Sequence, residues 1–495
     1  MKTIYNSLIA ICIIAAFVSC NDELTNEPIG LLTLDQIDTS PTIGTLESSV
    51  SSSYQLLAST LNLIGEWNWD DGSVLRNDFI LQDIASNDMN KKWNPDGDQA
   101  WMDELSAFSF TAENGAFNGL WLYDYEGINR INLAISYLTN SEVIQTVGIS
   151  DSRKNQLLGE AYFLRAFYYF DLVNNFGDVP LLTVPLISFE EAFDVAVRVP
   201  ATEIWGQINS DLSEAKTLLP NSKYPDPSEP WRVSKGAVIA LQAKTALYNE
   251  EWNSVIGLVS ELEGLGFYSL NAHYFDSFDV NKEFLENEVI FAYDHVSDQN
   301  PRNGNGLCAL VGWGFIAPSN NFISAFEDND PRLLYTVDID NQNVSKLLGN
   351  TVGDNKGNDD APSNKIFIRY ADVLLWKAEA LNETGDFAEA IAIINDIRNR
   401  ARTSPTADGS ITPPGTLADR PASTNATEIL GWIMSERRVE LGFESHRFND
   451  LKRWGIAQSF LTGLGKNFQD KNYLYPIPQG EVDKSGGTIT QNPGY

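Results

Sequence analysis

The pattern of apolar and polar residues predicts a chain built mostly of α-helices. The longest periodic run covers residues 155–185, where apolar side chains recur at helical spacing and aromatic residues fill most of the remaining circumference. A helix that is apolar nearly all round must be buried against several neighbours. Ser150 and Asp151 are candidate N-caps, and Gly177 followed by Pro180 predicts the end of the helix. We therefore expect one long inner helix with an extended exit.

Further helices are predicted on both sides of this run. Short turns divide residues 235–263 and residues 368–400 into two helix pairs. In the first pair Ala243 stands nine positions before Trp252, and the second pair repeats this spacing, which is typical of helical repeats such as the tetratricopeptide repeat. Other helices are predicted over residues 46–63, 116–138, 202–219 and 427–453.

Two long segments lack helical periodicity. The first, residues 64–115, carries four tryptophans among Asp, Asn and Gly residues, and the second, residues 266–364, is rich in Gly and Asn around Trp313. We expect both to be loop-rich inserts, with one strand at residues 289–293. The helical repeats are predicted at residues 116–263 and 366–455 of a single domain, residues 46–495, which ends in an extended tail, residues 473–495.

The first residues predict export and lipidation. Lys2 precedes an apolar run, residues 8–18, that is too short to span a bilayer as a mature helix, and a small residue and Cys20 follow. This order resembles a lipobox, in which the chain is cleaved before the cysteine and the cysteine is acylated. We expect a signal peptide at residues 1–19, lipid on Cys20 and a tether over residues 20–45. An ordinary secretory signal is the alternative.

Composition argues against several classes of function. The formal net charge of −33 disfavours nucleic acid and acidic polysaccharide as partners, although screening would let a local basic groove override this field. The three histidines lie far apart, and Cys308 has no partner cysteine in the mature chain, which argues against a zinc site. Acidic loops at residues 94–98 and 354–360 lack the full ligand spacing of an EF-hand and are interpreted as turns. We expect no metal and no cofactor.

Charges of opposite sign alternate along the last predicted helix. Three pairs stand three positions apart and would be neighbours on a helix: Arg437 with Glu440, Glu444 with Arg447, and Asp450 with Arg453. They are interpreted as ion pairs that fasten the helix to the scaffold. The alternative is a pair of carboxylates for glycoside hydrolysis. Carboxylates beside arginines have lowered pKa values, the opposite of what a general acid needs, so we favour ion pairs.

Four stretches carry a family resemblance. They are G-E-A-x-x-L-R-A-x-x-Y-F-x-L within residues 155–185, R-Y-A-D-V-L-L running into A-E-A at residues 369–380, the charged stretch at residues 436–454, and Q-N-P-G-Y at residues 491–495. In this order they resemble the SusD-like (RagB/SusD) outer-membrane lipoproteins over essentially the whole mature chain. The resemblance implies a non-enzymatic, cell-surface glycan-binding protein on tetratricopeptide-like repeats, anchored to the outer membrane by lipid, that acts as a lid on a SusC-like TonB-dependent transporter.

The aromatic residues of the two inserts are the candidate ligand contacts. A pyranose has an apolar C–H face that an indole ring can cover, and a hydroxylated rim that pairs with Asn, Asp and Arg. Covering a sugar face of roughly 50 Å² contributes on the order of 1 kcal/mol, so several rings are needed. The candidate platforms are Trp67, Trp69, Trp93, Trp101, Tyr293 and Trp313, and the candidate rim partners are Asn68, Asp70, Arg76, Asn77 and Asn94. For each tryptophan the alternative is a packed core beneath a long loop.

The aromatic inserts predict capture of an oligosaccharide, and the family resemblance implies that the protein delivers it to a SusC-like transporter. The acid-rich surface favours a neutral glucan, and laminarin and starch both fit. Two other functions stay open at this point. One is a helical glycoside hydrolase that uses the tryptophans as subsites, and the other is a repeat protein that binds a peptide or protein.

Overall fold

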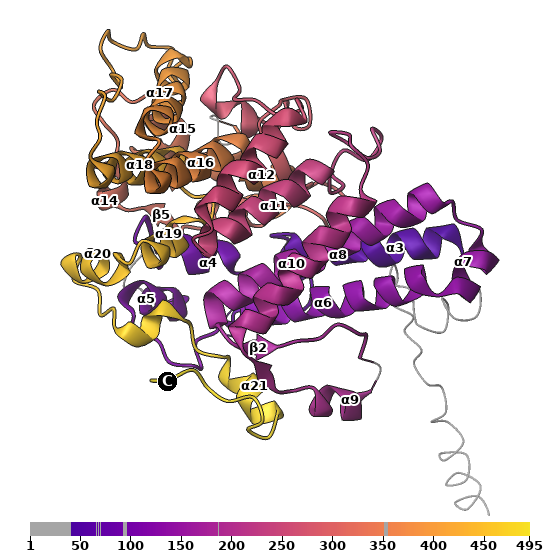
Figure 1. Cartoon of the computed structure of the whole chain (residues 1–495). Coiled ribbons are helices and arrows are strands. Elements are labelled where there is room, and N and C mark those ends of the chain that lie inside the picture. Colours follow the sequence, from indigo (N-terminus) through magenta and orange to yellow (C-terminus); the bar gives the residue numbers. More distant parts are fainter. Residues whose placement is uncertain are drawn as a thin grey trace, which may run out of the picture.

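The computed structural model describes residues 41–65, 67, 69, 71–92, 97–186, 188–350 and 355–495. The predicted signal peptide, Cys20 and most of the tether lie outside these residues. The described part is mostly helical, with a few short strands (Figure 1). Within it, no helix combines the length and apolar character needed to cross a membrane.

The predicted inner helix is α8 (Asp151–Phe176), and both of its predicted ends are confirmed. The Ser150 side chain accepts a hydrogen bond from the Arg153 amide, and Gly177 ends the helix with a φ of 74°. An ideal Cβ on Gly159 would lie 2.7 Å from Leu219, so glycine is needed for the close approach of the end of the neighbouring helix.

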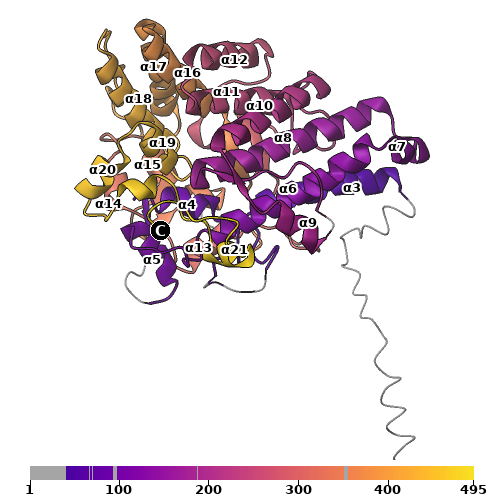
Figure 2. The same cartoon turned by 60° about the horizontal axis from the view of Figure 1, so that its bottom comes forward.

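Several helices before and after α8 complete the first half of the helical scaffold. α3, α6 and α10 all pack against α8 (Figures 1 and 2). Their apolar faces meet in one large core that also includes most of α8. These elements are α3 (Ile43–Tyr54) with the short helix η1 (Gln55–Leu57), α6 (Asn118–Thr139), α7 (Ser141–Val147), α9 (Phe189–Asp194) and α10 (Ala201–Leu218).

Two helical hairpins form the second half, as the repeat pattern predicts. α11 (Lys235–Tyr248) pairs with α12 (Trp252–Gly264), and α16 (Tyr370–Thr384) pairs with α17 (Phe387–Thr403). α12 packs against α16, so the hairpins stack in sequence, and α18 (Ala426–Glu440) covers α16 and α17. A second apolar core lies between these last helices.

The predicted final helix is interrupted, which corrects the expectation of one helix over residues 427–453. α18 ends at Glu440, and α19 (Arg447–Arg453) begins after a turn in which Phe443 and Ser445 have left-handed φ values of 65° and 64°. The tail over residues 473–495 is less extended than expected, because it contains the short helix α21 (Gln479–Lys484). Two other short helices, α20 (Ala457–Gly463) and η4 (Asp470–Tyr473), lie between α19 and this tail.

The described strands form two-stranded antiparallel ladders. The predicted strand is confirmed as β4 (Val289–Tyr293), which pairs with β8 (Lys365–Arg369) through an irregular register. The other ladders join β1 (Met89–Asn90) with β5 (Ala317–Pro318), β2 (Val179–Pro180) with β3 (Arg198–Val199), and β6 (Val337–Asp338) with β7 (Asn343–Val344).

The two loop-rich segments contain short helices that the sequence pattern missed. All are shorter than nine residues, too short for periodicity to be read with certainty. They are α4 (Asp78–Asp83), α5 (Ala100–Ala107), η2 (Tyr274–Ser277), α13 (Leu307–Gly312), α14 (Asn320–Ile323), α15 (Arg332–Thr336) and η3 (Lys346–Leu348).

Candidate functional site

The two loop-rich segments are joined by backbone pairing. In the β1–β5 ladder, Met89 lies opposite Pro318 and Asn90 lies opposite Ala317. The pairing extends at one end, where the Lys92 amide donates to the carbonyl oxygen of Phe315 at 3.2 Å. Residues that are more than 200 positions apart in the sequence are thereby held in register. This brings the aromatic residues of the two segments to one place.

Four aromatic rings meet there, and we call them the tryptophan cluster: Trp67, Trp69, Trp313 and Phe315. The ring centroids of Trp67 and Trp69 are 5.9 Å apart, and Trp313 lies 6.4 Å from Trp67 and 6.3 Å from Trp69. Trp67 is 52% exposed and Trp313 is 41% exposed, whereas Trp69 and Phe315 are partly buried, with their rings 5.5 Å apart. The cluster therefore offers indole surface to solvent on an aromatic base.

The rings of the cluster do not share a plane. Trp67 is tilted by 52° from Trp69 and stands at 89° to Trp313, and Trp69 makes an angle of 66° with Trp313. A ligand that covers more than one of these rings must therefore turn between them.

Trp313 is held on a buried support. It follows α13, whose residues Leu307 to Val311 are buried, and its amide donates to the Ala309 carbonyl at 2.8 Å. Gly312 packs against Gly357. A Cβ atom added to Gly312 would lie 2.1 Å from the Gly357 Cα atom, so the two backbones are in direct contact. The buried thiol of Cys308 on the same helix has its pKa raised to about 12 by burial, so it is an unreactive part of the support. The exposed ring thus projects from a packed base.

Two predicted platform residues are buried, which corrects their assignment as ligand contacts. Trp101 is 6% exposed because it lies on the inner side of α5, and its Nε1 donates to Gln99 Oε1 at 2.8 Å. Tyr293 is 7% exposed on β4, and its hydroxyl donates to Asn303 Oδ1 at 2.5 Å. Neither ring has a face open to a sugar.

Two predicted rim partners are also buried. The Arg76 guanidinium contacts three carboxylates, those of Asp78 at 2.5 Å, Asp124 at 2.9 Å and Asp171, and all of its charge is directed inward. The Asn77 amide donates to the carbonyl oxygens of Gly72 and Ala116 at 3.0 Å each. These side chains hold the first loop-rich segment against α6 and α8, and the expectation that they line a ligand surface is wrong.

The other predicted contacts lie outside the described residues. They are Trp93, Asn68, Asp70 and Asn94, and they stay predictions. Phe315 is the one cluster member that was not predicted as a site residue. No spacing rule would have found it, because Trp313 has helical dihedral angles and Gly314 has a φ of 82°, so a turn and not an extended strand brings Phe315 to the cluster.

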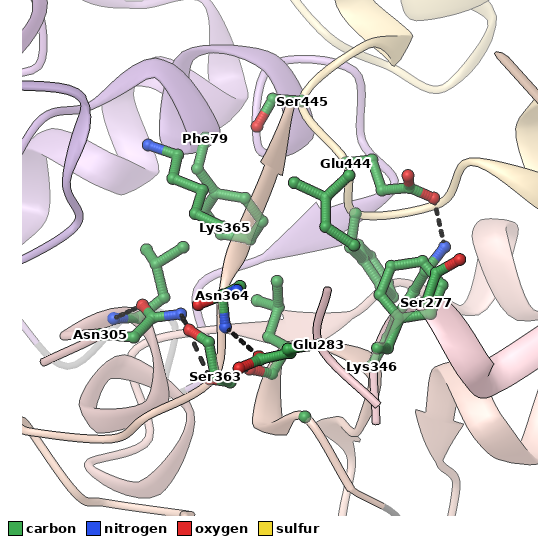
Figure 3. Close-up of a pocket in the computed structure, with 16 residues that line it drawn as sticks. Phe79, Ser277, Glu283, Asn305, Lys346, Ser363, Asn364, Lys365, Glu444 and Ser445 are labelled. Atoms are coloured by element: carbon green, nitrogen blue, oxygen red, sulfur yellow. Dashed lines mark hydrogen bonds and ion pairs between the residues drawn. The ribbon is translucent and has the colours of Figure 1, made fainter. Parts of the chain in front are cut away.

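A narrow cavity lies between β8, the second loop-rich segment and the turn after α18 (Figure 3). Its volume is about 40 Å³, which holds water but no sugar ring. Figure 3 shows Glu283 beside Asn364, and the backbone amide of Asn364 donates to Glu283 Oε1 at 2.8 Å. It also shows Glu444 pointing towards Lys346, with 2.6 Å between Glu444 Oε1 and Lys346 Nζ. Burial raises the pKa of Glu283 to about 8. We interpret this cavity as part of the packing.

The charged stretch of α18 and α19 forms a buried ion-pair network. Arg369 on β8 lies 2.7 Å from each of the carboxylates of Glu288, Glu440 and Glu444. Glu440 also binds Arg332 at 2.9 Å and contacts Arg400. The network therefore connects β8, α15, α17 and α18, and the interpretation that these charges fasten the last helices to the scaffold is confirmed.

The partners within the network differ from the predicted ones. Of the three predicted pairs, the structure shows Asp450 with Arg453, at 2.9 Å. Glu444 instead binds Arg369 and Lys346, because the turn after α18 carries it away from the helix surface. Burial alone would raise the pKa of Glu444, but the charges of these two partners lower it to about 2. A carboxylate held ionised in this way cannot serve as a general acid.

No group of three or more metal-ligating side chains occurs among the described residues. The acidic loops at residues 94–98 and 354–360, which were interpreted as turns, fall partly outside them.

Two family models match separate parts of the chain. One, described as the SusD family, matches residues 341–472, and the other, described as "Starch-binding associating with outer membrane", matches residues 35–247. SusD-like protein P2 of Formosa agariphila is 26% identical over 98% of both chains. SusD-like protein P25 of the same organism is 26% identical over 71% of this chain and 73% of its own length.

Solved structures share the fold over most of the chain. Surface glycan-binding protein A from Bacteroides fluxus has a TM-score of 0.74 at 25% identity and covers 92% of this chain and 100% of its own. A laminarin-binding SusD-like protein has a TM-score of 0.73 at 24% identity with the same coverage. Surface glycan-binding protein A from Bacteroides thetaiotaomicron, in complex with laminarihexaose, has a TM-score of 0.71 at 21% identity and covers 91% of this chain and 99% of its own. The chain belongs to the SusD/RagB family of non-catalytic, surface glycan-binding proteins associated with the outer membrane.

Proposed function

We propose that the tryptophan cluster captures a glucan at the cell surface and that the protein then delivers it to a SusC-like TonB-dependent transporter. The observation that carries this proposal is the meeting of Trp67, Trp69 and Trp313 from two distant segments within 6.4 Å of one another. Exposed tryptophans are costly in water, and a cluster of them on a rigid base marks a binding surface. Apolar sugar faces match such a surface.

The angles between the rings favour a curved glucan. A β-1,4-linked glucan extends as a flat ribbon and needs coplanar rings, whereas β-1,3- and α-1,4-linked glucans coil. The three indole rings are inclined to one another by 52° to 89°. We favour a β-1,3-glucan of the laminarin type, because one similar structure is that of a laminarin-binding protein and another is a complex with laminarihexaose. Starch is the competing ligand, in line with the description of one matching family model.

Weak contacts of this kind have to add up. Each ring contributes on the order of 1 kcal/mol when it covers a sugar face, so three rings contribute on the order of 3 kcal/mol. Hydrogen bonds to the sugar rim supply the remaining affinity, and Asn68, Asp70 and Asn94 are the proposed donors and acceptors. Trp93 is the proposed further platform.

The test is titration calorimetry of the full chain with laminarin oligosaccharides, maltooligosaccharides and cellooligosaccharides. We expect binding of the first, and binding that is about 30-fold weaker in Trp67→Ala with Trp313→Ala. Trp252→Ala is the matched control, because Trp252 is a partly buried tryptophan on α12, away from α13 in Figure 2. If only maltooligosaccharides bind tightly, the ligand is starch and not laminarin. If none of these sugars binds, the proposal is contradicted.

The anchor and the partner are tested separately. We propose that Cys20 carries lipid, so cells fed a labelled fatty acid should label the wild-type chain but not Cys20→Ala, and sugar binding should be unchanged. The transporter should copurify with the wild-type chain from detergent-solubilised membranes. Undiminished labelling of Cys20→Ala would contradict the lipid anchor.

A further inference from the structure

A second, larger cavity lies where the end of α8 meets β3, α10, α11, α19 and the C-terminal tail. Its volume is about 690 Å³, within the range of sites that hold small molecules. None of the residues that line it belongs to the tryptophan cluster. The cavity is therefore a separate place at which this chain can hold a ligand.

Aromatic side chains form one wall of this cavity. Trp205 on α10 and Tyr248 on α11 both pack against Phe170 of α8, with ring centroids 5.7 Å and 5.0 Å from it. Both rings are half-buried, so each is fixed on one side and lines the cavity on the other. Such rings can cover the C–H face of a sugar, as in the tryptophan cluster.

The cavity also holds a lysine without a carboxylate partner. Lys452 Nζ donates to the carbonyl oxygen of Asn174 at 2.9 Å and lies 5.0 Å from the centre of the Phe448 ring. An ammonium group has three donors, so this contact leaves two of them for a ligand. The next residue, Arg453, differs, because its guanidinium is neutralised by Glu379 and Asp450. Burial lowers the pKa of Lys452 to about 7 with no carboxylate opposing it.

A second cation in the cavity contacts neutral oxygens. Arg198 donates to the backbone carbonyls of Asp178 at 2.7 Å and Thr490 at 2.9 Å, and to Asn492 Oδ1 at 2.5 Å. The carboxylate that lines the cavity is that of Asp178, and its Oδ1 accepts the Ala201 amide at the start of α10 at 2.8 Å. When Lys452 is protonated, the side chains that line the cavity carry more positive than negative charge, although the chain as a whole carries −33, and a bound carboxylate would favour the protonated lysine.

We propose that this cavity is a binding site for an acidic sugar unit, such as a uronic acid, with the sugar ring against Trp205 and Tyr248 and the carboxylate paired with Lys452. The Asn174 side chain uses its Nδ2 on the Phe170 carbonyl at 2.7 Å, which leaves its Oδ1 to accept a sugar hydroxyl. The negative charge of the rest of the surface does not prevent this pairing, because salt screens it beyond about 8 Å. The site differs from the proposed glucan site in both place and ligand.

The test is saturation-transfer NMR and calorimetry of the full chain with sodium glucuronate and with methyl glucoside. We expect glucuronate to bind at least tenfold more tightly than the neutral glucoside, and Lys452→Met to remove this difference. Lys452→Arg keeps the charge and should keep the preference, and Trp205→Ala should weaken both sugars. Lys484→Met is the matched control, because that lysine is exposed on α21 and pairs with Glu481.

Other results would overturn the proposal. Equal binding of the two sugars would make this a neutral-sugar site, and undiminished glucuronate binding in Lys452→Met would place the acid elsewhere. Absence of glucuronate binding would also reject it, provided that circular dichroism shows a folded chain. The Trp67→Ala, Trp313→Ala double variant should bind glucuronate normally, so failure here and failure of the glucan proposal are distinguishable.

Discussion

The tryptophan cluster and the ion-pair network place their side chains in opposite ways. In the cluster, the large apolar rings of Trp67 and Trp313 face solvent, whereas in the network the charged side chains of Arg369 and Glu440 are almost completely buried. Both arrangements cost free energy when they are considered alone. The exposed rings of the cluster keep their unfavourable contact with water until a ligand covers them. In the network, oppositely charged side chains of the same chain compensate the cost of burying each charge. The comparison suggests that the first region serves binding and the second serves stability.

The two regions are also mechanically connected. Arg332 on α15 and Lys346 on η3 belong to the second loop-rich segment, and they bind Glu436 and Glu444 of the last helices at 2.6 Å each. The segment that carries Trp313 is thereby fastened to the helical scaffold. A fixed position of Trp313 lowers the entropy lost when a glycan binds.

The largest expected effect comes from Arg369→Met in the network. This change leaves Glu288, Glu440 and Glu444 buried with less compensating charge, so we expect a loss of about 3–5 kcal/mol in the free energy of unfolding. Chemical denaturation measures it. The control is Arg302→Met, which removes an exposed pair with Asp359 and should cost about 0–1 kcal/mol. Equal losses in the two variants would contradict the assignment of the network to stability.

Trp101→Ala compares a buried tryptophan with the exposed tryptophans of the cluster. Because Trp101 is buried in the core, its truncation should destabilise the chain by about 3–5 kcal/mol. The folded fraction should still bind laminarin oligosaccharide with wild-type affinity in calorimetry at low temperature. If its affinity falls while its stability is retained, the correction of Trp101 from ligand contact to core residue is wrong.

Acid should destabilise the chain through the network. The pKa of Glu444 is lowered from about 4.5 to about 2 in the folded state, so its stabilising contribution is complete above about pH 4.5 and is lost as the pH falls towards 2. This shift corresponds to about 3 kcal/mol. Denaturation curves between pH 6 and pH 2 measure it. Glu444→Gln should reduce the slope in this range, and an unchanged slope would show that Glu444 does not titrate as described.

Controls aside, the smallest expected change in the free energy of unfolding is that of the double variant Trp67→Ala, Trp313→Ala in the tryptophan cluster. Trp67→Ala with Trp313→Ala removes two sugar contacts of on the order of 1 kcal/mol each, so affinity should fall about 30-fold. Because about half of each side chain is exposed, the free energy of unfolding should fall by about 1–2 kcal/mol, less than in Arg369→Met or Trp101→Ala. A large loss of stability with unchanged affinity would reverse the roles of the two regions.

The long helices could be predicted from the sequence, and most of the site could not. The periodicity and caps of α8 depend on neighbouring residues, so they are visible in the chain itself. The burial of Trp101 depends on α5, a helix of eight residues that periodicity does not resolve. The burial of Arg76 could not be predicted, because two of its three carboxylate partners, Asp124 and Asp171, stand 48 and 95 positions away in the sequence.

The same limit applies to the charged stretch. Spacing predicts partners only where the helix is continuous, and the turn after Glu440 sends Glu444 to Arg369 instead of Arg447. The meeting of Trp67 with Trp313 was a hypothesis about two inserts that share one face. The β1–β5 ladder that brings them together is two residues long in each strand and leaves no pattern that the sequence reveals.

The central claim is that the rings of the tryptophan cluster are the sugar contacts, and fluorine NMR tests it directly. The chain labelled with 5-fluorotryptophan gives one resonance per indole, and single substitutions assign those of Trp67, Trp69, Trp313, and the buried Trp101 and Trp376. On titration with a laminarin oligosaccharide, the account predicts that the three cluster resonances shift together with one dissociation constant and that the two buried ones do not. Shifts confined to other tryptophans, with these three unmoved at saturation, would contradict it.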